Sequence, residues 1–170
     1  MNLKDALDRT VRCYPDEPAV VTDEGQSVTY AELDARATRL ANALARRIGT
    51  GRCAVLSVNT MAAIESMLAG NKRGVATVQL SYRATVEELA EMADTAAAAA
   101  VVFDDHNADE ALELVDRGVF EVAIHAGDRA IDRDDVDSYE AVLDAADPAL
   151  EPTLPAGEEC AVLYTSGTTS

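Results

Sequence analysis

The end of the chain holds the residues whose types and spacing are best suited to chemistry. Residues 160–170 read CAVLYTSGTTS, so an apolar run is followed by hydroxyl side chains around one glycine. Such a loop after a buried strand can turn several backbone N–H groups toward an anion, and its hydroxyls add donors. The Gly-Lys-Ser/Thr ending of a Walker loop is absent, and a frayed polar tail is the alternative. The predicted phosphate contacts are Thr165, Ser166, Gly167, Thr168 and Thr169.

Two acidic segments match other kinds of site less well. Residues 132–138, DRDDVDS, suggest a calcium loop, which needs an oxygen ligand at its fifth position and glycine at its sixth. Val136 and Asp137 occupy those positions, so we predict a solvated acidic loop and no metal site. Asp104 and Asp105 follow a predicted strand, as acids do in phosphate-accepting receiver domains. Those domains also need a later lysine, and the second half of the chain has none.

The histidines and cysteines form no catalytic pattern. His106 and His125 are the only histidines, and no serine or cysteine lies in a recognisable nucleophile elbow, so we predict capping or packing roles and no catalytic residue. Cys13, Cys53 and Cys160 are far apart and form no Cys-x-x-Cys pair, which argues against a disulfide framework and a zinc site. Each cysteine is in or beside an apolar segment, so we expect small buried residues.

Composition limits the classes of partner. The 170 residues suit one domain, and 31 acidic against 14 basic residues give a net charge of −17. This charge repels nucleic acid and anionic lipid, so neither is expected as a partner. A dock for a basic protein is one interpretation, but acids spread along the whole chain favour a general, halophile-like acidity. No long apolar run and no secretory signal are present, which predicts a cytoplasmic protein without a membrane span.

Apolar periodicity predicts alternating strands and helices. Thr29 with Glu32, and Thr85 with Glu88, have the spacing of capping boxes at helix starts. Short apolar strands between amphipathic helices indicate a parallel sheet covered on both faces. The predicted class is therefore α/β, with a Rossmann-like, mostly parallel sheet, helices on both faces and an N-terminal hairpin. The expected helices cover 2–13, 29–49, 59–74, 85–95, 107–118 and 139–146, and the expected strands cover 19–22, 27–30, 53–58, 75–80, 98–103, 119–125 and 160–164.

The last third of the chain is less regular. Residues 126–138 are acidic and polar, and we predict a loop there. Residues 146–158 form a proline-rich connector that leads to the last strand and its loop.

Four stretches together resemble the start of an AMP-forming acyl-CoA synthetase, of the adenylate-forming AMP-dependent synthetase/ligase family. YPDEPAVV followed by VTYAELDARATRLANAL is similar to the family's opening hairpin and first long helix. The long stretch from CAVLSVNT to SYRATVEEL, and then AAAVVFDD, resemble its next strands and helices. AVLYTSGTTS resembles its phosphate-loop signature, Tyr-Thr-Ser-Gly-Thr-Thr-Gly. The resemblance covers essentially the whole chain.

The resemblance implies a two-step reaction for the parent enzyme. A carboxylate attacks the α-phosphate of ATP, with Mg²⁺ offsetting phosphate charge, to give an acyl-adenylate and pyrophosphate. The thiol of coenzyme A then displaces AMP. The implied nucleotide contacts are the five loop residues 165–169, and LSYRAT favours a fatty or other carboxylic acid over an amino acid as substrate.

One departure from the family pattern is Ser170, which stands where the family has a second loop glycine. We expect residues 1–170 to be the first part of the AMP-binding N-terminal domain, arising by truncation, frameshift or a split gene, and a separate chain that forms the remainder of the enzyme is one candidate partner. The fragment is expected to be inactive alone and to expose an apolar sheet edge. The alternative is a stand-alone, non-catalytic module that binds a nucleotide or a partner.

Overall fold

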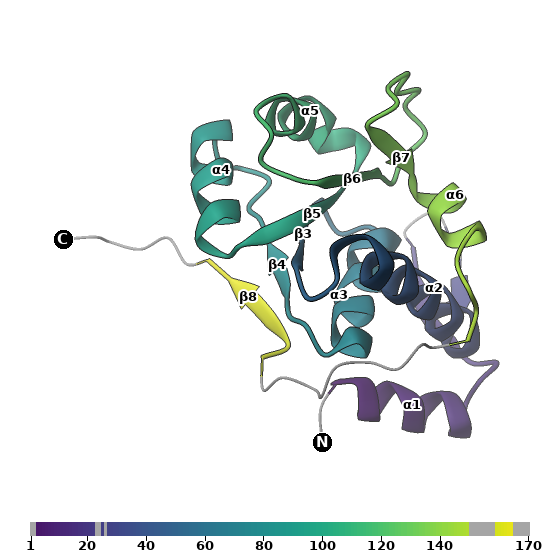
Figure 1. Cartoon of the computed structure of the whole chain (residues 1–170). Coiled ribbons are helices and arrows are strands. Elements are labelled where there is room, and N and C mark those ends of the chain that lie inside the picture. Colours follow the sequence, from purple (N-terminus) through teal and green to yellow (C-terminus); the bar gives the residue numbers. More distant parts are fainter. Residues whose placement is uncertain (1–2, 23–24, 26, 150–158, 165–170) are drawn as a thin grey trace.

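The computed structural model describes residues 3–22, 25, 27–149 and 159–164, and these form the expected α/β arrangement (Figure 1). Helices and strands alternate along most of the chain, as the apolar periodicity predicted. The described helices are α1 (Leu3–Cys13), α2 (Tyr30–Ile48), α3 (Met61–Arg73), α4 (Val86–Thr95), α5 (Ala108–Asp116) and α6 (Tyr139–Asp144), with a short 3-10 helix at Asp105–Asn107.

The described strands form two sheets. A six-stranded sheet has the order β7-β6-β5-β3-β4-β8, and every pairing in it is parallel. A separate antiparallel pair, β1 with β2, is the predicted N-terminal hairpin. The strands are β1 (Pro18–Val21), β2 (Ser27–Thr29), β3 (Arg52–Leu56), β4 (Thr77–Gln79), β5 (Ala98–Phe103), β6 (Val122–His125), β7 (Val136–Ser138) and β8 (Ala161–Leu163).

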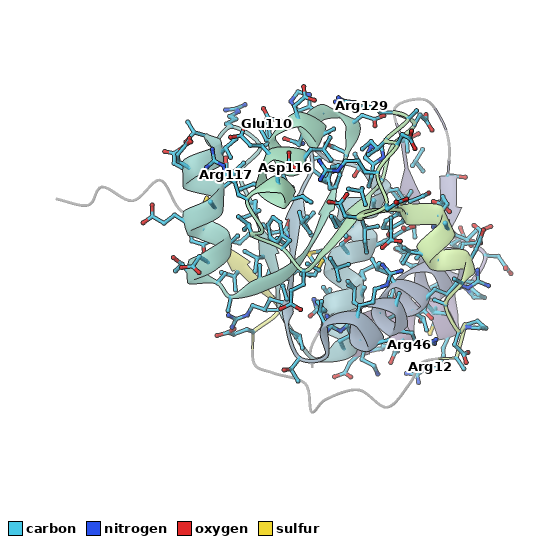
Figure 2. All side chains as sticks on the ribbon, turned by 45° about the horizontal axis from the view of Figure 1, so that its top comes forward. Arg12, Arg46, Glu110, Asp116, Arg117 and Arg129 are labelled. Atoms are coloured by element: carbon cyan, nitrogen blue, oxygen red, sulfur yellow. The ribbon has the colours of Figure 1, made fainter. Side chains whose placement is uncertain are left out.

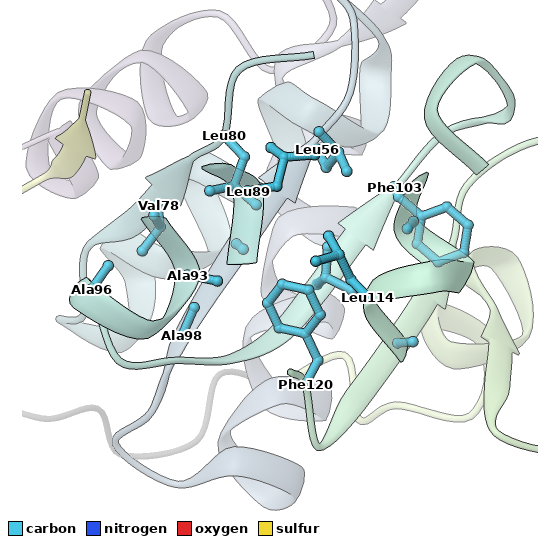
Figure 3. Close-up of a cluster of buried hydrophobic side chains, with 14 of the residues drawn as sticks. Leu56, Val78, Leu80, Leu89, Ala93, Ala96, Ala98, Phe103, Leu114 and Phe120 are labelled. Carbon is cyan, nitrogen blue, oxygen red and sulfur yellow. The ribbon is translucent and has the colours of Figure 1, made fainter. Parts of the chain in front are cut away.

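Alternation along β5 divides the core between the two faces of the sheet. Val101 and Phe103 point to one face, where α4 and α5 pack (Figure 3). Ala100 and Val102 point to the other face, which is covered by α2, α3 and α6. Because successive side chains of a strand point to opposite faces, a central strand covered on both sides must be apolar throughout.

Local capping interactions fix the starts of two helices. At the start of α2, the Thr29 hydroxyl accepts from the Glu32 N–H, and the Glu32 carboxylate accepts from the Thr29 N–H. Thr85 and Glu88 make the same reciprocal pair at the start of α4. Both predicted capping boxes are therefore confirmed.

The segment predicted as an acidic loop contains a strand that the sequence did not reveal. β7 adds to the edge of the sheet by pairing with β6, with Ala123 opposite Val136 and His125 opposite Ser138. Two of its three residues are exposed, so no alternating apolar pattern marks it. Backbone pairing and an ion pair from Arg47 to Asp137 hold it in place, and the prediction of a loop throughout 126–138 was wrong.

Charged side chains cover the outer surface (Figure 2). Arg117, for example, bridges Glu87 and Glu113 across α4 and α5. Exposed pairs of this kind contribute little to stability, because solvent screens them. The fold therefore depends on its two apolar layers rather than on the surface ion pairs.

The cysteines differ from one another in burial. Cys53 is buried in the sheet, as expected, but Cys13 and Cys160 are exposed, so the expectation of three buried cysteines was wrong. Cys13 is the last residue of α1, and Cys160 directly precedes β8. Burial raises the pKa of the Cys53 thiol to about 12, although the nearby Arg73 opposes this shift.

Thiol labelling should reflect this difference. A thiol-specific reagent at pH 8 is expected to modify Cys13 and Cys160 rapidly in the folded chain, because the reactive species is an accessible thiolate. Cys53 should react only after denaturation. Counting modified thiols by mass spectrometry before and after adding guanidinium chloride checks this, and rapid labelling of Cys53 in the folded protein would contradict the buried position of β3.

Candidate functional site

The strand that leads into the predicted phosphate loop lies within the parallel sheet. β8 pairs with β4, with Thr77 opposite Ala161 and Gln79 opposite Leu163. The carboxyl end of β8 therefore lies at the same edge of the sheet as the carboxyl ends of β3, β4, β5 and β6. In open α/β sheets, ligands bind outside this edge, so Tyr164, the residue after β8, lies at the edge where ligands bind in such folds.

Several contacts hold β8 in this position. Before the strand, Arg52 pairs with Glu159 at 3.0 Å, and the side-chain amide of Asn71 donates to the Cys160 carbonyl at 3.1 Å. After it, the Tyr164 hydroxyl donates to the Met92 carbonyl at the end of α4.

The outer side of β8 is more open. Leu163 is 71% exposed, and among the described strands β8 pairs with β4 alone. This agrees with the expectation of an apolar sheet edge. The predicted contacts Thr165, Ser166, Gly167, Thr168 and Thr169 lie outside the described residues, as does most of the 146–158 connector. Their assignment to phosphate binding therefore stays a prediction.

At the carboxyl end of β5, Asp104 organises the neighbouring loops. The residue is 5% exposed, and its carboxylate accepts from the Ser57 hydroxyl at 2.9 Å and the Val58 N–H at 2.8 Å. It also accepts from the backbone N–H and side-chain amide of Asn107, at 3.1 and 2.6 Å. These four hydrogen bonds connect the segments that follow β3 and β5. Asp104 is thus a structural cap, and the structure gives no support to a phosphate-accepting role.

The neighbouring Asp105 joins the carboxyl end of β6 to the loop that follows it. Its carboxylate lies 2.7 Å from Nε2 of His125 and accepts from the backbone N–H groups of Asp128 and Arg129 at 2.9 and 3.1 Å. Burial alone would raise the pKa of Asp105, but the two N–H donors and His125 outweigh it, so the pKa is lowered. The His125 ring also lies against Phe103, with centroids 5.2 Å apart, which confirms a packing role.

The second histidine has an equally modest environment. The His106 ring meets Tyr82 edge-on, with centroids 6.1 Å apart. It lies in the short 3-10 helix after β5, where the sequence placed the start of a helix.

A buried charged network behind this edge was missed by the sequence analysis. Glu65 of α3 is fully buried, and its carboxylate accepts from Nε of Arg36 at 2.6 Å and from the hydroxyl of Tyr139 at 2.7 Å. Arg36 also binds Glu140, which is partly exposed, at 2.6 Å. The available signal was a single acid in the otherwise apolar and small run MAAIESMLAG. The partners come from α2 and α6, far away in the sequence.

The electrostatics of this network are mutually supporting. The pKa of Arg36 is raised, chiefly by its hydrogen bond to Glu140 and then by Glu65, against the opposing effect of burial. The pKa of Tyr139 is raised well above its ordinary value, first by burial and then by the Glu65 charge. Tyr139 therefore stays a neutral donor to Glu65, and Arg36 stays charged. The network can hold α2, α3 and α6 together but offers no group ready for proton transfer near neutral pH.

A small cavity of about 250 Å³ lies beside the network, near the start of α3 and the end of β6. Its charged lining includes Arg36, which is paired as described above. Among the described residues, no group of three or more His, Cys, Asp or Glu side chains is placed to hold a metal ion. No helix in the described ranges is long and apolar enough to span a bilayer.

Comparison with known proteins gives the family. The model of a family described as AMP-binding enzyme matches residues 7–170. The chain is 27% identical, over 99% of its length, to the 3-oxocholest-4-en-26-oate–CoA ligase of Rhodococcus rhodochrous, and covers 31% of that protein. It is 33% identical, over 95% of its length, to a feruloyl-CoA synthase of Amycolatopsis sp., and covers 30% of it. The chain thus spans about a third of the length of these relatives.

Solved structures show the same fold. Mycobacterium smegmatis MbtA matches with a TM-score of 0.82 and 28% identity, over 99% of this chain and 32% of that one. An anthranilate CoA ligase, AuaEII, matches with a TM-score of 0.86 over all of this chain and 33% of its own; at 20% identity, that match speaks for the fold alone. The fold, the ordered sequence elements and the family match over residues 7–170 agree, and the chain belongs to the AMP-binding enzyme family, of which it covers the N-terminal part.

Proposed function

We propose that this chain forms the first part of the AMP-binding domain of an AMP-forming acyl-CoA synthetase. The observation that supports the proposal is the position of β8, because this parallel strand ends at the carboxyl edge of the sheet just before residues 165–169 in the sequence. Residues 165–169 would then hold the phosphates of ATP with backbone N–H groups and hydroxyls. In the family's reaction such donors stabilise the charge that moves to the leaving pyrophosphate.

The substrate class is a carboxylic acid, with ATP and coenzyme A as co-substrates. The CoA ligase and the feruloyl-CoA synthase named above support this class by their printed activities. A surfactin synthase subunit of Bacillus subtilis is also similar, at 30% identity over 94% of this chain. The LSYRAT stretch favours the acyl-CoA branch over amino-acid activation, with fatty acids among the candidate acids.

The reaction needs groups that the described residues do not supply. The described part of the chain has no cluster of carboxylates or histidines suited to Mg²⁺, so we derive no step through the metal ion. We propose that residues 1–170 have no activity alone and need the remaining two thirds of the enzyme, from the same chain or a separate one. The proposed location is the cytoplasm.

A labelling experiment tests the phosphate loop. ATP that carries a photoreactive group on its γ-phosphate is expected to label the peptide containing residues 161–170, and unmodified ATP should compete. The variant Ser166→Ala/Thr168→Ala should reduce labelling by about a hundredfold at subsaturating ATP, because each of the two lost hydrogen bonds to a charged group contributes about 1.5 kcal/mol or more. Thr50→Ala, an exposed hydroxyl at the amino edge of the sheet, is the control. Equal labelling of all three proteins would refute the loop assignment.

Isotope exchange between pyrophosphate and ATP tests the proposed lack of activity. Residues 1–170 with a panel of carboxylic acids should exchange at the background rate, because in our proposal the remaining part of the enzyme is needed for the reaction. Clear exchange above background would show that the chain carries out the first half-reaction by itself.

A further inference from the structure

A groove beside the N-terminal hairpin has an unusual cation in its wall. The groove has a volume of about 500 Å³ and lies between α2, the hairpin, and the starts of α3 and α6. One face of α2 provides its floor, through residues spaced three and four apart. The lining is Thr22, Ser27, Val28, Glu32, Ala35, Arg36, Arg39, Met61 and Glu140.

Most charged groups in this groove already have partners. The Glu32 carboxylate accepts from the backbone N–H and hydroxyl of Thr29 at 2.8 and 2.9 Å. Arg36 forms ion pairs with Glu65 and with Glu140. These groups therefore shape the groove but leave little capacity for binding a ligand.

Arg39 differs from them. Its Nε atom is buried and has no hydrogen-bond partner among the described residues, and its guanidinium forms none of the ion pairs found there. The other half-buried or buried cations make close contacts: Lys72 lies 2.6 Å from Asp34, and Arg73 donates to the Gly51 carbonyl at 3.3 Å.

The absence of an acceptor needs a physical explanation. The chain has 31 acidic and 14 basic residues, so acidic side chains that could pair with Arg39 are abundant in the sequence. Leaving a buried donor unsatisfied costs stability, and such groups in native proteins are generally explained by strain, function or an absent ligand. A guanidinium that faces a groove is best satisfied by an oxyanion, which can accept two parallel N–H bonds.

We propose that the Arg39 groove is a binding site for a small organic acid with one carboxylate and a compact apolar body. The carboxylate would accept from the guanidinium of Arg39, and the apolar body would pack on Val28, Ala35 and Met61. Glu32 and Glu140 also line the groove, so it disfavours a phosphate dianion, which would bring a second negative charge beside them. The volume of the groove lies in the range of small-molecule binding sites in proteins.

This site is distinct from the proposed nucleotide loop. The groove lies on the face of the sheet that α2 covers, whereas β8, which precedes the proposed loop in the sequence, lies at the sheet edge opposite to β7 (Figure 1). A bound acid would tie the hairpin to α2 through Arg39. Its failure to bind would leave the assignment of residues 165–169 unaffected, because the photolabelling experiment does not involve the groove.

Fluorine NMR tests the proposal with 4-fluorobenzoate as the probe and the purified chain. We expect saturable broadening of its signal, and an affinity that falls by about tenfold or more in Arg39→Gln, since a charge-assisted pair is worth at least about 1.4 kcal/mol. Arg12→Gln removes the same charge from an exposed position of α1 and should bind like the wild type. Thermal unfolding establishes that both variants fold.

Two further probes complete the test. The neutral 4-fluorobenzamide should not bind, and inorganic phosphate should not displace 4-fluorobenzoate. Absence of saturable binding, an Arg39→Gln affinity equal to that of the wild type, or an equal loss in Arg12→Gln would each overturn the proposal. Binding of the amide, or displacement by phosphate at similar concentration, would refute the organic-acid specificity.

Discussion

The Glu65→Ala variant is expected to lower the free energy of unfolding by about 3–5 kcal/mol, because it breaks a buried charged network from one side. Arg36 would lose its buried carboxylate partner, and the Tyr139 hydroxyl would lose the acceptor that lies 2.7 Å away. A cavity would also open among α2, α3 and α6. Urea denaturation followed by circular dichroism at pH 7 measures the loss.

A matched variant separates burial from charge. Glu140→Gln removes the second carboxylate bound to Arg36, but this carboxylate is 64% exposed, so the expected loss is below about 1 kcal/mol. The double variant Glu65→Leu/Tyr139→Phe removes both polar groups together and should be more stable than Glu65→Ala, since no hydroxyl is left without an acceptor. Equal losses for Glu65→Ala and Glu140→Gln would contradict the burial argument.

The Asp104→Ala variant is expected to cost about 3 kcal/mol. The change leaves four donors without their common acceptor. The Ser57 hydroxyl and the Val58 N–H are only partly buried, so water can replace their bonds. The two Asn107 donors are buried, and unsatisfied buried donors cost about 1–3 kcal/mol each. Urea denaturation measures the total, and faster hydrogen exchange of the Val58 amide would locate the loss at the carboxyl edge of the sheet.

Asp109→Ala provides the comparison for Asp104. Asp109 also lies near the end of β5, but its side chain is 80% exposed and forms a surface ion pair with Arg129. Its loss is expected to stay within about 1 kcal/mol. If the two variants lost the same stability, Asp104 would not be the organising group of these loops.

Both predictions concern the framework that would carry the nucleotide loop. Asp104 holds together the loops at the carboxyl ends of β3 and β5, and Glu65 holds three helices behind the same sheet. In our proposal the loop after β8 contributes its donors to the same edge. Precise placement of such donors is what makes them effective in transition-state stabilisation, so a rigid sheet is a requirement of the proposed function.

The sequence by itself determined the features that depend on neighbouring residues. Alternating apolar strands and amphipathic helices predicted the α/β class, and the Thr29–Glu32 and Thr85–Glu88 spacings predicted two helix starts that the structure confirms. These features can be predicted from sequence because the interacting residues lie only a few positions apart in the same helix or strand. The phosphate-loop composition also came from the sequence, together with the order of the segments around it.

Only the tertiary structure decided the features that depend on distant partners. Strand β7 exists because β6 offers an edge to pair with, and no local apolar pattern marks it. Glu65 is stable inside the protein because Arg36 and Tyr139, 29 and 74 residues away, supply its hydrogen bonds. Arg39 became notable only when its buried Nε atom proved to have no hydrogen-bond partner among the described residues. The hydrogen-bond partners of a buried polar group come from distant parts of the chain that folding brings together. Residue spacing in the sequence therefore does not reveal them.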